Sequence, residues 1–253
     1  MKLLMSMIVL IALASPAAAL NFDQNVTPDV IFGTGNDNGF FTTDIGGGVE
    51  LGLRGKLRFD GSNLPQNYFG SNGDGTYTFI SGSAPGGFPW LPDPSGTPIW
   101  NFEFAINTDV DGTSGLKLAD LTYELGLDFD PDPASTNYLI FDPVTPSASA
   151  PYYDHSLGDN TTDETTDVVS GDAPSYVTNL STYNVAQNSW NYVFFDTAPF
   201  DNFDPTLDGV YEIYLRAFDG SGSLVAETAI SIVVGGAVAT DDTAWGDVKA
   251  LYR

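Results

Sequence analysis

Apolar and polar residues alternate in this chain over long stretches, and this spacing of two residues is the strongest constraint on its fold. The clearest runs are residues 49–59, 100–106, 121–129 and 211–218. A period of two is typical of a β-strand, because successive side chains point to opposite faces of a sheet. In the first run one face carries Val49, Leu51, Leu53, Leu57 and Phe59, and the other carries Glu50, Arg54, Lys56 and Arg58. We expect such polar faces to be solvent-exposed.

Shorter strands are predicted at 29–32, 40–45, 76–80, 137–141, 189–195 and 223–234, with Gly-, Pro-, Asn- and Asp-rich turns between them. No helical pattern separates the strands. The sequence therefore predicts an all-β fold, an antiparallel β-sandwich of jelly-roll-like or Ig-like type, with a single domain at residues 20–235. The acidic, Thr-rich segment 147–175 lacks the pattern and is predicted to be an excursion on the surface.

Both ends of the chain differ from this domain. Residues 1–19 combine Lys2, the apolar run LLMSMIVLIALA and a final Ala-Ala-Ala, which is typical of a secretory signal peptide. Residues 236–253 are predicted to be a linker and a short tail, in which Trp245 and Leu251 share one side of a short helix. We expect a secreted or cell-surface protein with no transmembrane segment in the mature chain.

The charge balance narrows the range of partners. The chain has 33 acidic and 8 basic residues, a formal net charge of -25, and no cysteine. Nucleic acids and anionic membranes are disfavoured because they require basic patches. Disulfides, Cys-ligated zinc and iron–sulfur clusters are excluded. Most of the acidity is Asp, which favours turns, so calcium held by loop carboxylates is one interpretation. Solubility, or adaptation to salty surroundings, is the other.

The stretch NTDVDGTSG at 107–115 resembles the first half of an EF-hand loop. Asn107, Asp109 and Asp111 occupy positions one, three and five, but Leu118 stands where a bidentate Glu should close the site. A strand also precedes the loop, so an EF-hand is excluded. We predict instead a calcium site on a β scaffold, formed by these three residues with Asp128 and Asp130. The alternative is that the same side chains only cap turns.

The sequence is compatible with two further functions, carbohydrate binding and polysaccharide cleavage. Trp90, in the Pro-rich stretch FPWLPDPSG, is predicted to be exposed and is a candidate for stacking on sugars, with extracellular polysaccharide or envelope components as partners. A polysaccharide-active enzyme would need a pair of carboxylates, for which Glu103 and Glu124 are candidates. His155 is the only histidine and lies in the segment without strand pattern, so a Ser–His–Asp triad is not expected. We do not expect an enzyme.

Several segments together resemble a family of secreted bacterial proteins, many of which end in a PEP-CTERM sorting signal. They include TPDVIFGTGNDNGFFT, WNFEFAINTDVDGTSGLKLADLTYELGLDFDP and GVYEIYLRAFDGSGSLVAETAI. The resemblance implies export to the envelope or matrix and a β-rich fold, and it brings no catalytic residues. The sorting signal itself is absent, because the chain ends in WGDVKALYR without a Pro-Glu-Pro motif, an apolar helix or a basic cluster.

Overall fold

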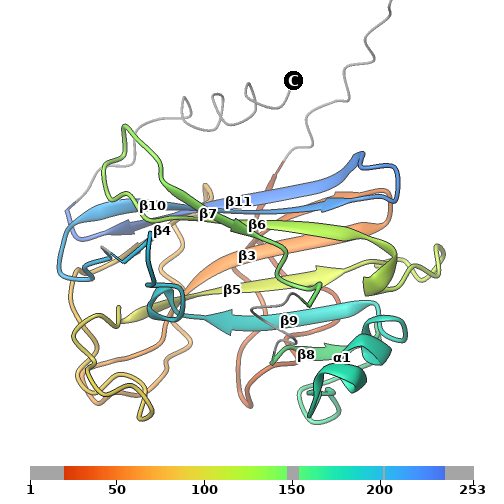
Figure 1. Ribbon diagram of the computed structural model, residues 1–253, viewed down its shortest axis with the longest axis horizontal. Coiled ribbons are helices and arrows are strands. Elements are labelled where there is room, and N and C mark those ends of the chain that lie inside the picture. Colours follow the sequence, from red (N-terminus) through yellow and green to blue (C-terminus); the bar gives the residue numbers. More distant parts are fainter. Residues whose placement is uncertain (1–19, 147–153, 202, 237–253) are drawn as a thin grey trace, which may run out of the picture.

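The computed structural model describes residues 20–146, 154–201 and 203–236. It confirms an all-β sandwich of two packed sheets (Figure 1). One sheet has the order β1 (Asn21–Gln24), β2 (Phe41–Gly46), β3 (Val49–Leu57), β5 (Trp100–Asn107), β9 (Val185–Trp190) and β8 (Ser156–Gly158). The other has the order β4 (Thr76–Phe79), β11 (Leu224–Val234), β10 (Gly209–Phe218), β6 (Thr122–Asp128) and β7 (Tyr138–Phe141). The predicted signal peptide and the tail at 237–253 lie outside the described residues.

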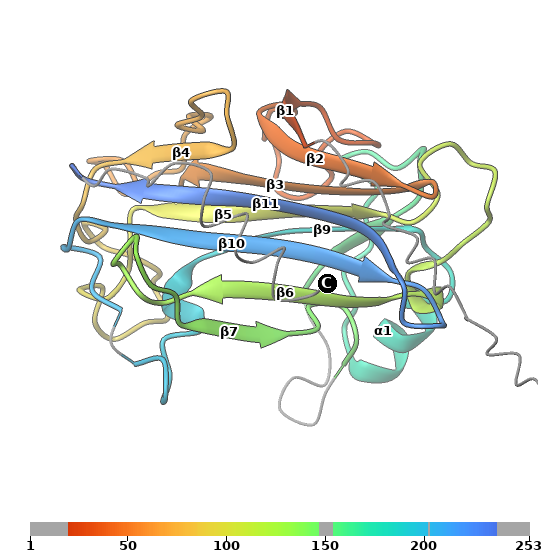
Figure 2. The same ribbon diagram turned by 90° about the horizontal axis from the view of Figure 1, so that it is seen from above.

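Figure 2 looks onto the five-stranded sheet, with β3, β5 and β9 of the other sheet behind it. The described strands pair antiparallel with one exception. Strand β4 pairs in parallel with β11, at residues Ser231 to Val234 of β11. The main core lies between the sheets and is rich in aromatic residues. Trp100 is only 1% exposed and contacts the rings of Tyr192, Phe203 and Tyr211. The alternating positions of the predicted strands therefore fill this core.

The outer face of the six-stranded sheet differs from the prediction, because it is buried. Glu50, Arg54 and Lys56 of β3 are each less than 10% exposed. The chain before β2 lies across them, so residues 29–32, predicted to be a strand, form instead part of a covering segment that we define as residues 25–40. Its apolar side chains pack on the sheet in a small separate cluster of Val26, Val30, Phe32, Phe41 and Ala105. Alternation identifies the residues that share a face, but it does not identify what covers that face.

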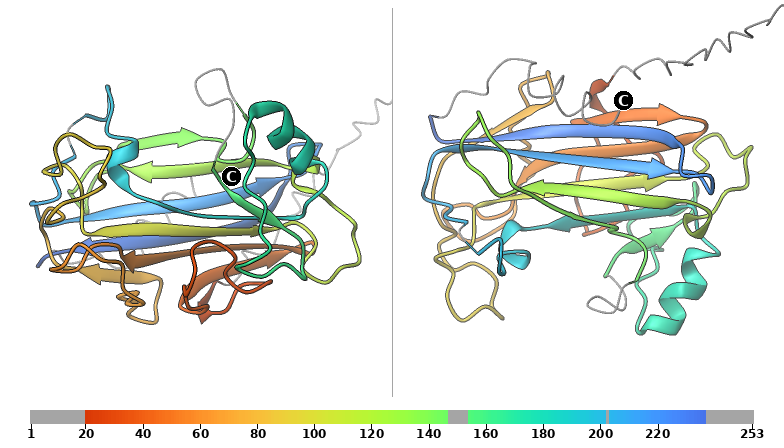
Figure 3. Two further views of the ribbon diagram at one scale, coloured as in Figure 1. Left: turned by 90° about the horizontal axis from the view of Figure 1, so that it is seen from below. Right: turned by 45° about the horizontal axis from the view of Figure 1, so that its top comes forward.

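The segment 147–175 is also more ordered than predicted, in the part that the structure describes. It contains β8 and the beginning of helix α1 (Ala173–Leu180). The helix lies beside β8 in the right panel of Figure 3. Asp172 caps the helix through the backbone N–H of Ser175 at 2.8 Å, and Pro174 occupies its first turn. The helix buries Tyr176 and Leu180 against the core. Among the described residues, no helix combines the length and the apolar character needed to cross a membrane.

Candidate functional site

Asn107 closes β5 and is a structural residue. It is 1% exposed. Its side-chain oxygen accepts hydrogen bonds from the N–H of Asp109 (3.0 Å) and the Asn184 amide (2.9 Å), and its own amide donates to the Thr27 carbonyl at 2.7 Å. Both lone pairs of that oxygen are therefore engaged within the protein. Asn107 ties the loop after β5 to two other segments, which does not require a metal.

Asp109 and Asp111 each accept hydrogen bonds from their own loop. Asp109 accepts from the N–H and hydroxyl of Ser114, both at 2.8 Å, and from the N–H of Gly115 at 3.1 Å. Although burial acts in the opposite direction, these hydrogen bonds hold the pKa of Asp109 below its ordinary value. Asp111 accepts from the N–H and hydroxyl of Thr113 at 2.9 and 2.7 Å. This is the turn-capping alternative.

Asp128 and Asp130 lie at the other end of the sandwich from Asp109. Phe129, which lies between them in the sequence, contacts the ring of Tyr192 at 5.0 Å, and Trp100 at the start of β5 contacts the same ring. Asp109 instead follows the end of β5. Figure 1 shows the two loops at opposite ends of the molecule. One site built from all four carboxylates is therefore not formed. Across residues 20–146, 154–201 and 203–236, no three His, Cys, Asp or Glu side chains are grouped to hold a metal ion. Calcium binding itself stays a prediction.

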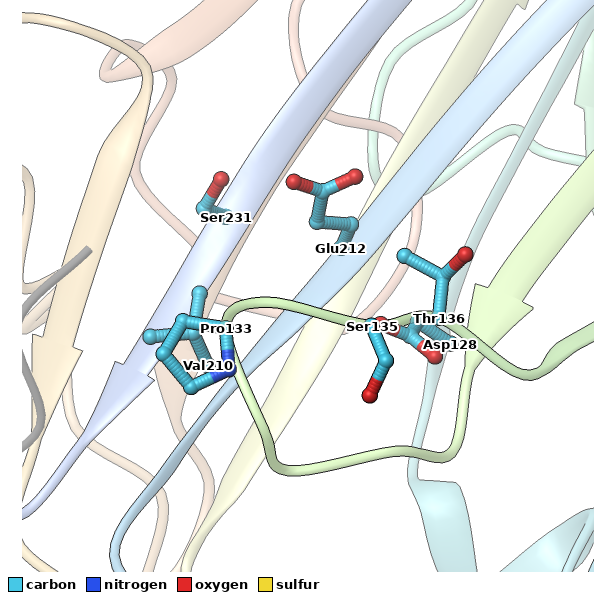
Figure 4. Close-up of a pocket in the computed structure, with 7 residues that line it drawn as sticks. All are labelled: Asp128, Pro133, Ser135, Thr136, Val210, Glu212 and Ser231. Atoms are coloured by element: carbon cyan, nitrogen blue, oxygen red, sulfur yellow. The ribbon is translucent and has the colours of Figure 1, made fainter. Parts of the chain in front are cut away.

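A small pocket lies on the outer face of the five-stranded sheet, under the loop that follows β6 (Figure 4). Asp128 is 1% exposed there, and one of its oxygens accepts from the N–H groups of Asp130 (3.0 Å) and Asn137 (2.7 Å), which lie near the two ends of that loop. Burial raises the pKa of Asp128 to about 7, and the nearby Glu212 carboxylate acts in the same direction. The pocket is lined by Asp128, Pro133, Ser135, Thr136, Val210, Glu212 and Ser231.

The sequence did not single out Glu212 as a partner of Asp128. Glu212 accepts a hydrogen bond from the Tyr138 hydroxyl at 2.7 Å, and its neighbour Ile213 pairs with Leu127, next to Asp128. Both carboxylates occupy polar positions of alternating strands, which was visible in the sequence. The register of β6 against β10, which brings them together, was not.

The candidate catalytic residues do not share a cleft. Glu103 is 1% exposed on the outer face of the six-stranded sheet, where the Arg54 guanidinium lies 2.6 Å from it. Glu124 lies on the outer face of the other sheet, 3.0 Å from Arg216. His155 is fully buried, with its ring nitrogens near the Pro143 carbonyl (2.6 Å) and the Asn188 amide (3.1 Å), and burial lowers its pKa to about 4. It is a neutral core residue at physiological pH.

Among the residues that the structure describes, Trp90 has the most exposed aromatic side chain, at 67%. Its ring stacks on Phe88 at 4.8 Å, and Phe88 in turn contacts Phe194 at 4.8 Å and Phe59 at 5.0 Å. We call Phe59, Phe88, Trp90 and Phe194 the Trp90 cluster. Phe59 and Phe88 are buried and form its base, whereas Trp90 and Phe194 face solvent. The exposed position of Trp90 agrees with its place in a Pro-rich loop.

Arg58 adds a cation to this cluster. Its guanidinium carbon lies 4.5 Å from the ring centre of Phe59 and 5.2 Å from that of Phe88. Within the described part of the chain, its guanidinium makes no ion pair with a carboxylate. Burial lowers the pKa of Arg58 without neutralising it in practice, because an arginine stays protonated in proteins. The cluster therefore combines exposed aromatic faces with nearby hydrogen-bond donors.

Comparisons with family models, with curated proteins and with solved structures gave no match. The resemblance to secreted proteins with PEP-CTERM signals thus stays a prediction, and function is argued below from the geometry of this chain.

Proposed function

We propose that this protein is an exported, non-catalytic β-sandwich of the cell surface or extracellular matrix that binds carbohydrate through the Trp90 cluster. The observation that carries the proposal is the 67% exposure of Trp90 on a base of buried rings. An indole held in this way presents an apolar face that a sugar ring can cover, and little conformational entropy is lost because the loop is already ordered by its packing. The signal-like residues 1–19 support the location.

Two further features favour binding over catalysis. The side chains that could serve a glycosidase, Glu103 and Glu124, lie on outer faces of different sheets and are each paired with an arginine. The Trp90 cluster instead has Arg58 beside it, whose N–H groups are suited to sugar hydroxyls or carboxylates. A binding surface needs only such a platform and a few donors, whereas hydrolysis needs two carboxylates across one bond.

The test is binding of the mature protein to a panel of soluble polysaccharides, measured by affinity electrophoresis and then by calorimetry with the best oligosaccharide. We expect Trp90→Ala to weaken binding at least about tenfold, which corresponds to about 1.4 kcal/mol. The melting temperature should change little, because Trp90 is mostly exposed. Tyr68→Ala is the matched control, since Tyr68 is an exposed aromatic residue (54%) outside the cluster. Equal binding by the wild type and Trp90→Ala would contradict the proposal.

A further inference from the structure

A buried polar cluster lies where the covering segment crosses β3 and β5. In the antiparallel register Arg54 of β3 stands opposite Glu103 of β5, and Lys56 lies on the same face as Arg54. Asn36, from the covering segment, reaches down to these residues. Lys56 and Glu103 are 8% and 1% exposed. A buried lysine, a buried glutamate and the half-buried amide of Asn36, from three separate segments, therefore lie close together.

The orientation of each group is set by its neighbours. The Lys56 Nζ is in direct contact with the Asn36 side-chain oxygen, which also accepts from Nη2 of Arg54 at 3.5 Å. The Asn36 side-chain nitrogen faces Oε1 of Glu103 at 3.5 Å, and Lys56 Nζ lies 3.8 Å from that same oxygen. The other oxygen of Glu103 is held by Arg54 Nε at 2.7 Å. Glu103 Oε1 is thus fixed between the amine and the amide nitrogen.

We propose that Lys56 and Asn36 are joined by an intramolecular isopeptide bond, and that Glu103 carries the proton during its formation. The neutral Lys56 amine attacks the Asn36 side-chain carbonyl carbon, so a Nζ–Cγ bond forms. The Cγ–Nδ2 bond then breaks and the nitrogen leaves as ammonia. Glu103 Oε1 accepts a proton from Lys56 and delivers it to the leaving nitrogen. Overall a lysine ammonium and a carboxamide give a secondary amide and an ammonium ion, with no oxidant, reductant or cofactor.

Arg54 and the surrounding rings suit this step. The Arg54 Nη2 lies beside the Asn36 oxygen, where negative charge develops as the carbonyl carbon becomes tetrahedral. The guanidinium carbon of Arg54 also lies over the rings of Phe41 and Phe69, 4.2 and 4.0 Å from their centres. Burial also lowers the pKa of Lys56, which favours the neutral amine, although Glu103 and Asp37 oppose this shift.

The bond has a clear structural role in this chain. It ties the covering segment to β3 of the sheet beneath it. Without this bond, the covering segment is attached to the sheet only by hydrogen bonds and by the small apolar cluster around Val26 and Phe41. The sequence has no cysteine and therefore no disulfide with which to close this loop. A covalent link between residues 36 and 56 restricts the unfolded chain in the same way as a disulfide.

Tryptic peptide mapping tests the proposal directly. Trypsin cleaves after Arg54, Lys56 and Arg58, but an acylated Lys56 is not cleaved. We expect one branched species, in which Gly55–Arg58 is attached to the peptide that contains Asn36 and ends at Arg54. Its mass should be lower than the sum of the two peptides by one ammonia, about 17 Da. Recovery of a linear Asn36 peptide of full mass together with separate 55–56 and 57–58 peptides would overturn the proposal.

Variants separate the chemistry from the fold. Lys56→Arg retains the positive charge beside Glu103 but should yield only linear peptides, and its melting temperature should fall by about 10 °C. Lys117→Arg, at a lysine outside the cluster, is the matched control and should retain the branched species. Asn36→Asp should give a branched product of the same mass as the wild type, because water leaves in place of ammonia. If any one of these three outcomes is not observed in a folded variant, the isopeptide bond between Lys56 and Asn36 is contradicted.

Glu103→Gln should abolish or strongly slow the reaction, but it also removes the partner of a buried arginine and can impair folding. It is therefore interpreted only if circular dichroism shows a folded protein. Branched peptide at the wild-type rate in folded Glu103→Gln would remove Glu103 from the mechanism. The isopeptide bond and carbohydrate binding by the Trp90 cluster are tested by separate variants, so either can fail without the other.

Discussion

The carboxyl group of Asp128 carries a pH dependence that can be measured. Its folded-state pKa of about 7 lies above the usual value near 4, because burial disfavours the charged form. Between these values the unfolded chain has released a proton that the folded chain still holds. The free energy of unfolding must therefore fall as pH rises from about 4 to about 7, and this loss persists above pH 7. Glu50, whose pKa burial also raises to about 7, acts in the same direction.

We predict that Asp128→Asn raises the free energy of unfolding at pH 8 by about 2 kcal/mol. The substitution should also make the free energy of unfolding depend less steeply on pH between pH 5 and 8. Asparagine retains an oxygen to accept from Asp130 and Asn137, but it does not ionise. Urea denaturation at several pH values measures both effects. Asp204→Asn is the control, because hydrogen bonds from Thr206 lower the pKa of Asp204 and keep it ionised over this range. An unchanged slope in Asp128→Asn would refute the prediction.

For single residues, the sequence predicted the exposure of Trp90 correctly, but it did not predict which residues lie close together in the fold. Trp90 was predicted to be exposed from its Pro-rich neighbourhood, and it is. His155 belongs to the segment without strand pattern, which was predicted to lie on the surface, yet its side chain lies in the core. There its ring contacts the Pro143 carbonyl and the Asn188 amide, which are 12 and 33 residues away in the sequence. Asn36 was not noticed at all, since nothing local distinguishes an amide that meets a lysine 20 residues away.

Strands β6 and β10 show how closely two elements can depend on each other. The Tyr214 ring of β10 lies across β6 at Gly126, its direct partner in the register, so that a Cβ at position 126 would overlap the ring. Tyr214 is 3% exposed and packs against Tyr138 at 5.2 Å. Glycine at this strand position gives up strand propensity in order to admit an aromatic ring on the outer face.

We predict that Gly126→Ala lowers the free energy of unfolding by about 1–3 kcal/mol, because the ring must shift or the strands must separate. Gly61→Ala is the matched control, since no atom lies within 4 Å of a Cβ built at that glycine, and its effect should stay within about 0.5 kcal/mol. Chemical denaturation of the two variants measures the difference. Similar stabilities would show that Tyr214 moves aside without cost.

Alternation predicted the elements that line the core, namely β3, β5, β6 and β10, because their inward faces are filled by apolar side chains at every second position. It failed for residues 29–32, which are apolar because they cover a sheet and not because they belong to one. Helix α1 was also missed, although Asp172, Pro174 and Ser175 form a recognisable helix start. The helix is short, and its buried face consists of only two residues.

The charge of the whole molecule gives a prediction about salt. With 33 acidic and 8 basic residues the folded chain repels itself, and the described cations Arg54 and Arg216 are already paired with glutamates. Raising NaCl from about 10 mM to about 150 mM shortens the Debye length from about 30 Å to about 8 Å. We expect the melting temperature to rise by a few degrees, because compaction then costs less electrostatic energy.

A comparison of cations at equal ionic strength tests the calcium prediction. If the predicted calcium binding occurs, CaCl2 should raise the melting temperature more than MgCl2 does, and a chelator should reverse the difference. Equal rises with the two salts would contradict the calcium prediction and leave Asp109 and Asp111 only as caps of their own loop. The β-sandwich class was predictable from the sequence. Whether the loops after β5 and β6 lie together was not, because this depends on which ends of the two strands are neighbours in the fold.

The hydrogen bond from the Ile31 backbone to the Gln187 side chain, 2.9 Å long, has a consequence for the order of folding. The first part of the domain to be synthesised is held by a strand made 156 residues later. Strand β5 pairs with both β3 and β9, so the surface on which residues 25–40 rest is complete only when β9 has emerged. The apolar side chains of residues 25–40 therefore have no complete surface to pack against until the late strand has been made.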